Sequence, residues 1–416
     1  MNPNHVKETV DSLRDELYQL ALDLVRIPSV TGDEDTAQDM LAGRLREWDL
    51  DVDLWTIESG ITSHRAYCDD GLPVERKNLV ARWGPREETA ALILNGHIDV
   101  VPPGEREQWD ADPFDARIHQ DALHGRGSCD MKGGLAACCI AVRAAMKLGI
   151  EPKRSILVQS VTGEETGGLG TLAAIERGYR ADAAVIAEPT SLEMCPVQAG
   201  ALSFRLRVRG KAAHGAMRTW GVSAIEKFLP VFRKLEAFES KRHQGFRHPF
   251  YHEEQLVAPL SVGKVQAGNW PSTVPDELVA EGRFGVFPGE DCDKARRAFE
   301  DVVRSAGDDD DWLADNPVAV EWFEGQFEPG ETASDAPILE ELETCHHELL
   351  GNRPRTHGVS YGSDLRLFTR YADMPAVLYG PGDVALAHAT NEWLPLDELV
   401  HAAEVFTYLI ATKLNS

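Results

Sequence analysis

The sequence has few basic residues for its number of acidic ones, and this imbalance excludes several classes of partner. Its 42 lysines and arginines stand against 68 aspartates and glutamates, which gives a formal net charge of −26 at pH 7. A surface with that charge repels nucleic acids and anionic membranes, so we expect neither as a partner. Small molecules are the expected ligands or substrates.

Long apolar runs, a signal peptide and paired cysteines are also missing. No stretch approaches the roughly 20 apolar residues that cross a bilayer. The N-terminus, "MNPNHVKETVDSLRDELYQ", lacks the basic-then-apolar order of a signal peptide. The seven cysteines form no CxxC pair, so neither a disulfide framework nor a structural zinc knuckle is expected. These absences predict a cytoplasmic protein.

Strand and helix patterns alternate along the first half of the chain. Such alternation is typical of a mostly parallel sheet covered by helices on both faces. Helices are predicted at 6–26, 34–47, 133–149 and 170–178, and strands at 51–57, 78–83, 90–96, 154–162 and 183–189. The end of the chain resumes this pattern, with a helix at 336–350, a strand at 375–380 and a helix at 396–413.

The segment between these two parts has a different pattern. "LSFRLRVRGKAAH" alternates with period two, a helical pattern covers about 221–238, and further alternating strands follow. At 416 residues the chain is long enough for two domains. We therefore predict an α/β catalytic domain formed by 1–197 and 327–416, with an α+β domain inserted at 198–326.

Acidic and imidazole side chains follow several of the predicted strands. In an open α/β sheet, ligands bind beyond the carboxyl ends of the strands, so residues far apart in sequence can meet at that edge. The candidates are His97 with Asp99, Asp130, Glu164 with Glu165, Glu188 and His388.

The spacing within these pairs suggests separate roles. Residues i and i+2 of an extended chain point to the same side, so Asp99 could accept the ring N–H of His97 and leave the other ring nitrogen for a metal. The side chains of Glu164 and Glu165 diverge because the two residues are adjacent. One can bind a metal while the other remains available as a general base.

Charge counting favours two cations over one. Asp130, Glu165 and Glu188 carry three negative charges, and neutral histidines carry none. One divalent cation would leave this set anionic, whereas two would leave a slight positive excess that a hydroxide cancels. If Asp130 bridges the ions, each has three protein ligands and an open position for water, as catalytic zinc requires.

Two other classes of function remain open. "GVSYG" at 358–362 fits the G-x-S-x-G serine nucleophile elbow, with His388 later in the chain. That motif needs a buried strand directly before it, and the preceding "LGNRPRTH" is polar and interrupted by proline. A non-catalytic metal-binding protein would lack the base or a ligand, and the sequence lacks neither.

Six motifs, taken together and in order, resemble a known family. They are "NGHIDVVPPG", "GRGSCDMKGG", "TGEETGG", "AEPT", "GKAAHG" and "GPGDVALAHATNE". The family is the dinuclear-zinc group of acetylornithine deacetylase, succinyl-diaminopimelate desuccinylase, aminoacylase and carboxypeptidase G. The resemblance covers the chain from its first helix to its last. It implies a zinc-peptidase-like catalytic domain with an inserted lid that also serves in dimerisation.

The resemblance also implies the metal ligands. His97, Asp130 and Glu188 would hold one cation. His388, Asp130 and Glu165 would hold the other, so that Asp130 bridges the two. Zinc is the expected metal at both positions, and Co²⁺ is an expected substitute.

Further roles follow from the same resemblance. Glu164 is the implied general base, and Asp99 supports His97. His214, in "GKAAHG", is implied to reach the active site of a partner in a homodimer and to stabilise the oxyanion. The Asp130–Met131 peptide bond is expected to be cis.

The implied reaction is metal-assisted hydrolysis of an amide bond. Asn269, Arg283 and Ser363 are the expected substrate contacts, although an insertion separates Asn269 from the Val-Pro that normally follows in the family segment. The segments "GPGDVALAHATNE" and "YGSDLRLF" resemble acetylornithine deacetylase-type members of the family, which predicts a small N-acyl amino acid as the substrate. A dipeptidase or carboxypeptidase activity is the alternative.

Overall fold

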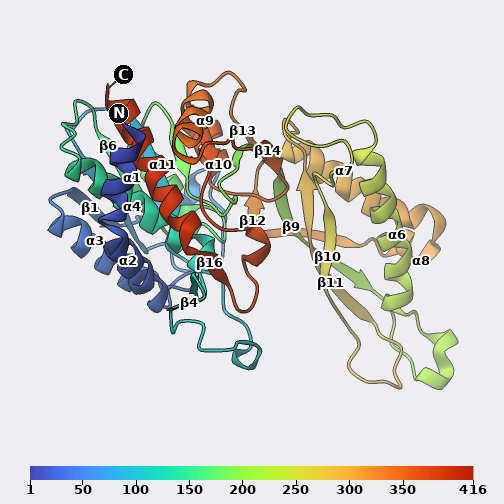
Figure 1. Ribbon diagram of the computed structural model, residues 1–416. Coiled ribbons are helices and arrows are strands. Elements are labelled where there is room, and N and C mark those ends of the chain that lie inside the picture. The colour runs from blue at the N-terminus through green and yellow to red at the C-terminus, as the bar shows by residue number, and fades with distance from the viewer. Residues whose placement is uncertain (416) are drawn as a thin grey trace. The chain divides into compact units, whose positions relative to one another are not determined.

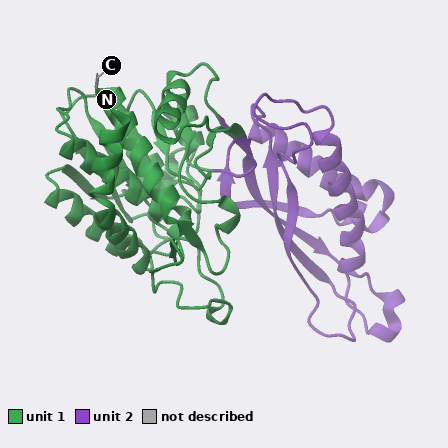
Figure 2. Cartoon of the chain, viewed as in Figure 1, with its two compact units in different colours: residues 1–197, 331–357, 363–416 green, residues 198–330, 358–362 purple. Residues whose placement is uncertain are grey.

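The computed structural model describes residues 1–415, and its chain forms two compact units (Figure 2). Unit 1 comprises residues 1–197, 331–357 and 363–416, and unit 2 comprises residues 198–330 and 358–362. Each unit has its own sheet and helices. The catalytic and lid roles of the two predicted domains stay predictions.

Unit 1 is built on a nine-stranded sheet with a parallel centre. The neighbouring strands β6, β3, β7 and β15 pair in parallel, whereas β1, β2 and β8 pair antiparallel towards the edges. The strand order is β1 (Asp51–Thr56), β2 (Lys77–Trp83), β6 (Ile156–Val161), β3 (Leu92–His97), β7 (Ala184–Ile186), β15 (Ala376–Leu378), β8 (Met194–Gln198) and β13 (Gly330–Glu331), with β14 (Thr356–Val359) paired to β8.

Helices pack against both faces of this sheet, because the central strands are apolar throughout and must be covered on two sides. Every residue of β3 and β6 is buried. One helical layer contains α1 (Pro3–Asp11), α2 (Arg14–Arg26), α4 (Gly133–Lys147), α9 (Pro337–Leu350) and α11 (Leu396–Asn415). The other contains α3 (Asp35–Glu47), α5 (Leu169–Glu176) and α10 (Leu365–Tyr371). Figure 1 shows α1, α4 and α11 of the first layer lying side by side.

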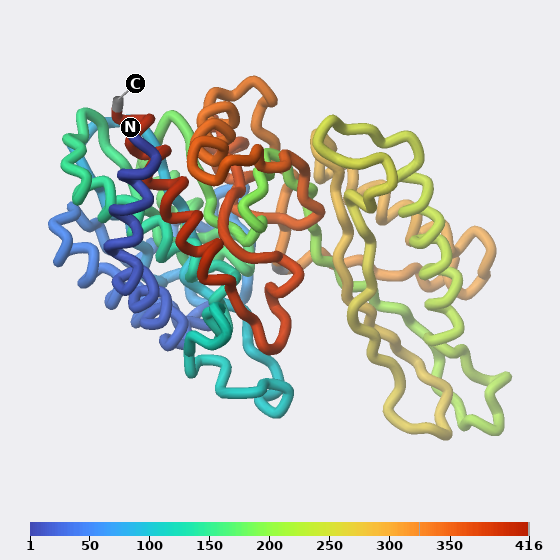
Figure 3. The backbone as a smooth tube through the Cα atoms, in the orientation of Figure 1, coloured from blue at the N-terminus to red at the C-terminus, as the bar shows by residue number. Residues whose placement is uncertain are grey.

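The first predicted helix, 6–26, is two helices in the structure. The N–H of Ser12 bonds to the Glu8 carbonyl, and its hydroxyl donates to the Thr9 carbonyl at 2.6 Å, which ends α1. A serine hydroxyl that bonds to a nearby backbone carbonyl competes with helix continuation in this way. The chain then restarts as α2, while α1 runs beside the last helix, α11 (Figure 3).

Unit 2 is an antiparallel sheet with helices on one face. The strand order is β10 (Leu260–Ala267), β11 (Glu277–Val286), β9 (Gly200–Arg209) and β12 (Ala319–Phe327). Burial alternates along β9, so Phe204 and Leu206 enter a core with residues of α6 (Ala224–His243) and α7 (Cys292–Arg304). The opposite face carries ion pairs such as Arg205 with Glu281.

The remaining elements are short. A three-stranded sheet contains β4 (Arg117–His119), β5 (Ala122–His124) and β16 (Trp393–Pro395), and α8 covers Asp311–Asp315. Among the described residues, no helix combines the length and apolarity needed to cross a membrane. The predicted fold class, an α/β sheet of mostly parallel character with a further α+β part, is confirmed.

Candidate metal centre

The candidate site lies at the carboxyl ends of the parallel strands of unit 1. His97 is the last residue of β3, and the loops after β6 and β7 carry Glu164, Glu165 and Glu188. Because β3 pairs in parallel with both β6 and β7, these three strand ends lie next to one another. The sheet therefore brings a histidine and three acids to one edge.

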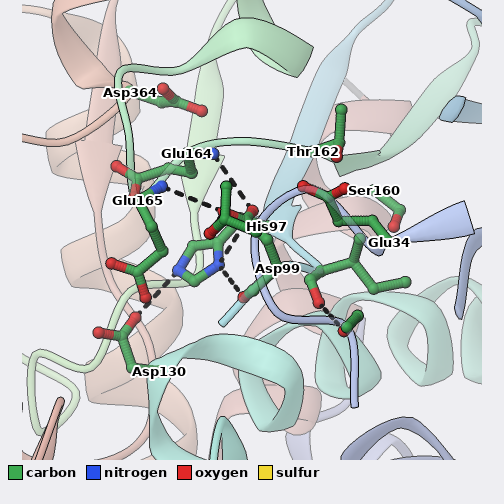
Figure 4. A network of polar contacts seen from close by, with 12 residues as sticks. Glu34, His97, Asp99, Asp130, Ser160, Thr162, Glu164, Glu165 and Asp364 are labelled. Carbon is green, nitrogen blue, oxygen red and sulfur yellow. Dashed lines mark hydrogen bonds and ion pairs between the residues drawn. The ribbon is translucent and has the colours of Figure 1, made fainter. Parts of the chain in front are cut away.

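Asp130 lies between the two histidines of the site (Figure 4 shows it beside His97). Its Oδ1 is 2.9 Å from His97 Nε2, and its Oδ2 is 3.4 Å from His388 Nε2. His388 Nε2 is also 3.0 Å from Glu165 Oε2. The Asp130–Met131 peptide bond is cis, as predicted. One carboxylate with a histidine on each oxygen is the arrangement expected of a bridging ligand.

The structure contains two groups of three potential metal ligands, and within each group the ligand atoms lie within 4.8 Å of one another. One group joins His97, Asp130 and Glu165, and the other joins His97, Glu164 and Glu188. The predicted ligand set of His97, Asp130 and Glu188 does not coincide with either group. His97 belongs to both, Asp130 to the first, and Glu188 to the second together with Glu164. All the candidate acids meet at one place, while their division between two cations stays a prediction.

Asp99 supports the site in a different way from the one predicted. The ring Nδ1 of His97 is 2.9 Å from the Asp99 backbone carbonyl but 3.7 Å from its carboxylate. The carboxylate instead accepts the backbone N–H groups of Glu164 and Glu165, each at 3.2 Å (Figure 4). The reason is the pairing of β3 with β6, which places the loop after β6 within reach of the Asp99 carboxylate.

Burial and mutual repulsion govern the acids of the site. Burial, and then the charge of Glu188, raise the pKa of Glu164 well above its ordinary value. Burial, and then the charge of Asp130, do the same to the pKa of Glu188. Burial alone would also raise the pKa of Asp130, but hydrogen bonds with His388 and His97 outweigh it and hold that pKa well below its ordinary value.

The histidines respond to this negative charge in the opposite direction. Hydrogen bonds with Asp130 and Glu165 raise the pKa of His388 to about 10. Burial opposes charge on His97, yet the nearby carboxylates raise its pKa well above the ordinary value. Two imidazoles and several buried carboxylates that repel one another fit divalent cations, which would replace the protons and neutralise the acids.

Glu392 and Arg126, which were not among the predicted site residues, also support the site. The buried Glu392 carboxylate accepts the N–H groups of Gly127, Cys129 and Asp130 at 2.8–3.0 Å and pairs with Arg126 at 2.7 Å. Arg126 also donates to the His388 carbonyl at 3.3 Å. Both residues occur in the quoted motifs "GPGDVALAHATNE" and "GRGSCDMKGG", which is the signal that could have identified them.

The other predicted residues lie elsewhere. His214 is exposed in unit 2, where its Nδ1 accepts the Ala216 N–H at the start of the turn Gly215–Trp220. Asn269 is exposed after β10, and Arg283 is on β11. Ser363, in unit 1, is buried and accepts the Leu365 N–H. The roles of these four residues stay predictions.

The serine motif has a different environment from the one a nucleophile elbow requires. Contrary to expectation, a short strand, β14, does precede Ser360. The helix that should follow at once begins only at Leu365. The Ser360 hydroxyl donates to the Leu256 carbonyl at 3.2 Å rather than to an imidazole. This geometry gives no support to a serine hydrolase.

Comparisons with known proteins agree with the resemblance. A model of peptidase family M20/M25/M40 matches residues 93–412. The chain is 29 % identical to the N-formyl-4-amino-5-aminomethyl-2-methylpyrimidine deformylase of Halalkalibacterium halodurans, over 94 % of this chain and 92 % of that protein. It is also 29 % identical to the acetylornithine deacetylase of Myxococcus xanthus, over 85 % and 88 % of the two chains.

Solved structures share the fold across the whole chain. The dipeptidase Dug1p from Saccharomyces cerevisiae superposes with a TM-score of 0.78, covering 100 % of this chain and 99 % of that one. The two sequences are only 16 % identical, so this likeness concerns the fold alone.

Zinc binding to the metal-free protein should release protons, with an affinity that rises with pH. The pKa of His388 is raised to about 10 without metal, and the pKa of His97 is raised as well, so a cation must displace the proton that His388 holds at neutral pH. As the pH rises towards about 10, the His388 proton competes less. Calorimetric titration in buffers of different protonation enthalpy measures this release, and His388→Ala should reduce it. Equal release from both proteins would contradict the assignment.

Proposed function

The chain belongs to peptidase family M20/M25/M40 and is a metal-dependent hydrolase of amide bonds, and from that premise we propose that it removes the acyl group from a small N-acyl amino acid. The proposed centre holds two divalent cations, most simply zinc, between the ligands His97, Asp130, Glu165, Glu188 and His388. Cations bound there would supply Lewis-acid activation of a water and of the substrate carbonyl.

Glu164 is the proposed general base. Its carboxylate is buried beside His97 and Glu188 but is not needed as a ligand in the proposed set. The raised pKa moves this carboxyl towards neutrality, where proton transfer in both directions is most efficient. Glu164 would take a proton from the attacking water and later deliver it to the nitrogen of the departing amine.

The environment of Arg283 is the observation that supports the proposed substrate class. Its guanidinium donates to the Ser360 carbonyl at 2.9 Å, and among the side chains that the structure describes no acidic group forms an ion pair with it. Burial lowers its pKa, which reflects the cost of a partly desolvated cation. A substrate carboxylate would supply the missing charge and accept a two-pronged hydrogen bond. N-acyl amino acids carry such a carboxylate.

A second candidate keeps the same reaction but changes the substrate. Dipeptides also carry a free carboxylate, and the fold is shared with a dipeptidase. The similarity to a pyrimidine deformylase over most of the chain adds N-formyl aminopyrimidines to the substrates worth testing. These compounds have no carboxylate that Arg283 could bind. The contribution of Arg283 to kcat/KM therefore distinguishes substrates with a carboxylate from the pyrimidines.

The proposed homodimer would form through unit 2. Strand β10 is an edge of its sheet, and Val265 on that strand is 49 % exposed. Helix α6 packs against β10 and exposes Ile225 and Leu229, one helical turn apart. An open edge beside exposed apolar side chains is a surface suited to pairing with a second copy. In such a dimer, exposed His214 would serve the active site of the partner subunit.

Glu164→Gln should keep its metal and lose most of its turnover. The amide preserves the shape of the side chain but cannot accept the proton, so kcat should fall roughly 10²- to 10⁴-fold. Elemental analysis and kinetics on the same preparation make this check, with chelated and zinc-restored wild-type protein as controls. A variant that retains wild-type turnover would remove Glu164 as the base.

A panel of N-acetyl, N-succinyl and N-formyl amino acids, dipeptides and an N-formyl aminopyrimidine tests the substrate. N-acyl amino acids should give the highest kcat/KM. Arg283→Ala should lower that value roughly 10- to 100-fold, because a charged hydrogen bond is lost. Arg207→Ala, on the exposed part of the neighbouring strand, is the matched control. Turnover confined to dipeptides or to the pyrimidine would overturn the deacylase proposal.

Mixing two inactive variants tests whether His214 acts across a dimer. In a mixed dimer of Glu164→Gln and His214→Ala, one of the two sites would receive both intact residues. An equal mixture should regain about a quarter of wild-type activity after subunit exchange. Glu164→Gln mixed with His388→Ala is the control, since both changes affect unit 1. No regain in the first mixture would place the action of His214 within its own chain.

A further inference from the structure

The segment that carries the proposed base is a short loop after β6, residues 163–167, which we call the glutamate loop. It contains Glu164 and Glu165, so small shifts of its backbone move a base and a metal ligand together. The Asp99 carboxylate holds the N–H groups of both glutamates. These contacts fix one side of the loop and leave the position of its far side to other residues.

A second carboxylate, Asp70, holds that far side. Its Oδ2 accepts the Thr166 hydroxyl at 2.8 Å and also pairs with Arg76 Nη2 at 2.8 Å. Asp70 and Arg76 belong to the long connection between β1 and β2, which is remote from the glutamate loop in sequence. The Asp70 side chain is only 3 % exposed, so its contacts are shielded from water.

Arg76 is itself placed firmly by its surroundings. The residue is 3 % exposed, and its Nη1 is 3.5 Å from Oε1 of Glu34, which is fully buried. A guanidinium between two shielded carboxylates has little freedom to turn. The Asp70 Oδ2 that accepts the Thr166 hydroxyl is therefore held in place by Arg76.

Glycines at both ends of the glutamate loop allow this connection to approach closely. Gly163 has φ +67°, and a Cβ there would lie 3.1 Å from Arg76 Nη1. Gly167 has φ +136°, and a Cβ there would lie 2.4 Å from the Cβ of Cys68. The connection thus packs against the loop at its first and last residues, as well as bonding to Thr166 between them.

We propose that Asp70 is a positioning residue for the hydrolytic reaction. It acts through the Thr166 hydroxyl, with Arg76 fixing its own orientation, and it sets the position of Glu164 and Glu165 relative to His97 and His388. The inference rests on the roles proposed above for these two glutamates. It assigns a function in catalysis to the connection between β1 and β2, which contributes neither a ligand nor the base.

Thr166→Val tests the contact with the least disturbance, since only the hydroxyl is exchanged for a methyl group. We expect kcat to fall roughly tenfold at nearly constant KM, because small misplacement of a reacting group is costly. Zinc affinity in a competition titration should fall roughly tenfold through Glu165, as for other residues that orient metal ligands. Thr166→Ser should restore both. Thr62→Val, whose exposed hydroxyl bonds to Ser59 in the same connection, should change neither.

Asp70→Asn and its combination with Thr166→Val provide the second test. If the two residues act as a unit, the double variant should lose no more kcat than the stronger single variant. Additive losses, or a Thr166→Val enzyme with wild-type kcat and zinc affinity, would overturn the inference. Glu164→Gln is measured in parallel. If it is inactive while Thr166→Val is normal, only the positioning role fails, whereas an active Glu164→Gln contradicts the proposed base and this inference together.

Discussion

Burying several carboxylates together at one edge of a sheet is the constraint on which the rest of this structure depends. Each charge loses hydration and repels its neighbours, which is why the pKa values of Glu164 and Glu188 are raised. Two imidazoles respond by holding protons more tightly. A cluster of this kind costs free energy of folding unless cations occupy it. The proposed metal centre would supply those cations.

The fold meets this constraint by holding the backbone around the cluster with hydrogen bonds to shielded acids. Parallel strands bring His97 and the glutamates to one edge, but strand order alone does not set their distances. Asp99, Glu392 and Asp70 do so, each as a shielded acid that bonds to the loops carrying the reactive side chains. Carboxylates outside the proposed ligand set thus position those within it, as residues that hydrogen-bond to metal ligands or to their loops commonly do.

Sequence patterns were sufficient for the fold class and for finding the residues that meet at the site. Parallel strands have an unambiguous apolar signature, and each of the strand-end acids and histidines follows one of them or lies in a recognisable motif. The limits appear where the answer depends on contacts between distant segments. Three features could not be predicted from the spacing of residues along one strand or helix. They are the contact of His97 with the Asp99 backbone carbonyl, the Ser12 hydrogen bonds that end the first helix, and the hydrogen bonds of Glu392.

The metal content of the protein is the most direct measure of this account. After reconstitution with Zn²⁺ and removal of the excess, elemental analysis should find about two zinc ions per chain. The same protein with Asp130→Ala should hold clearly less, because the carboxylate that we propose as a ligand of both cations is lost. Wild-type protein that binds no stoichiometric metal under these conditions would contradict the central claim.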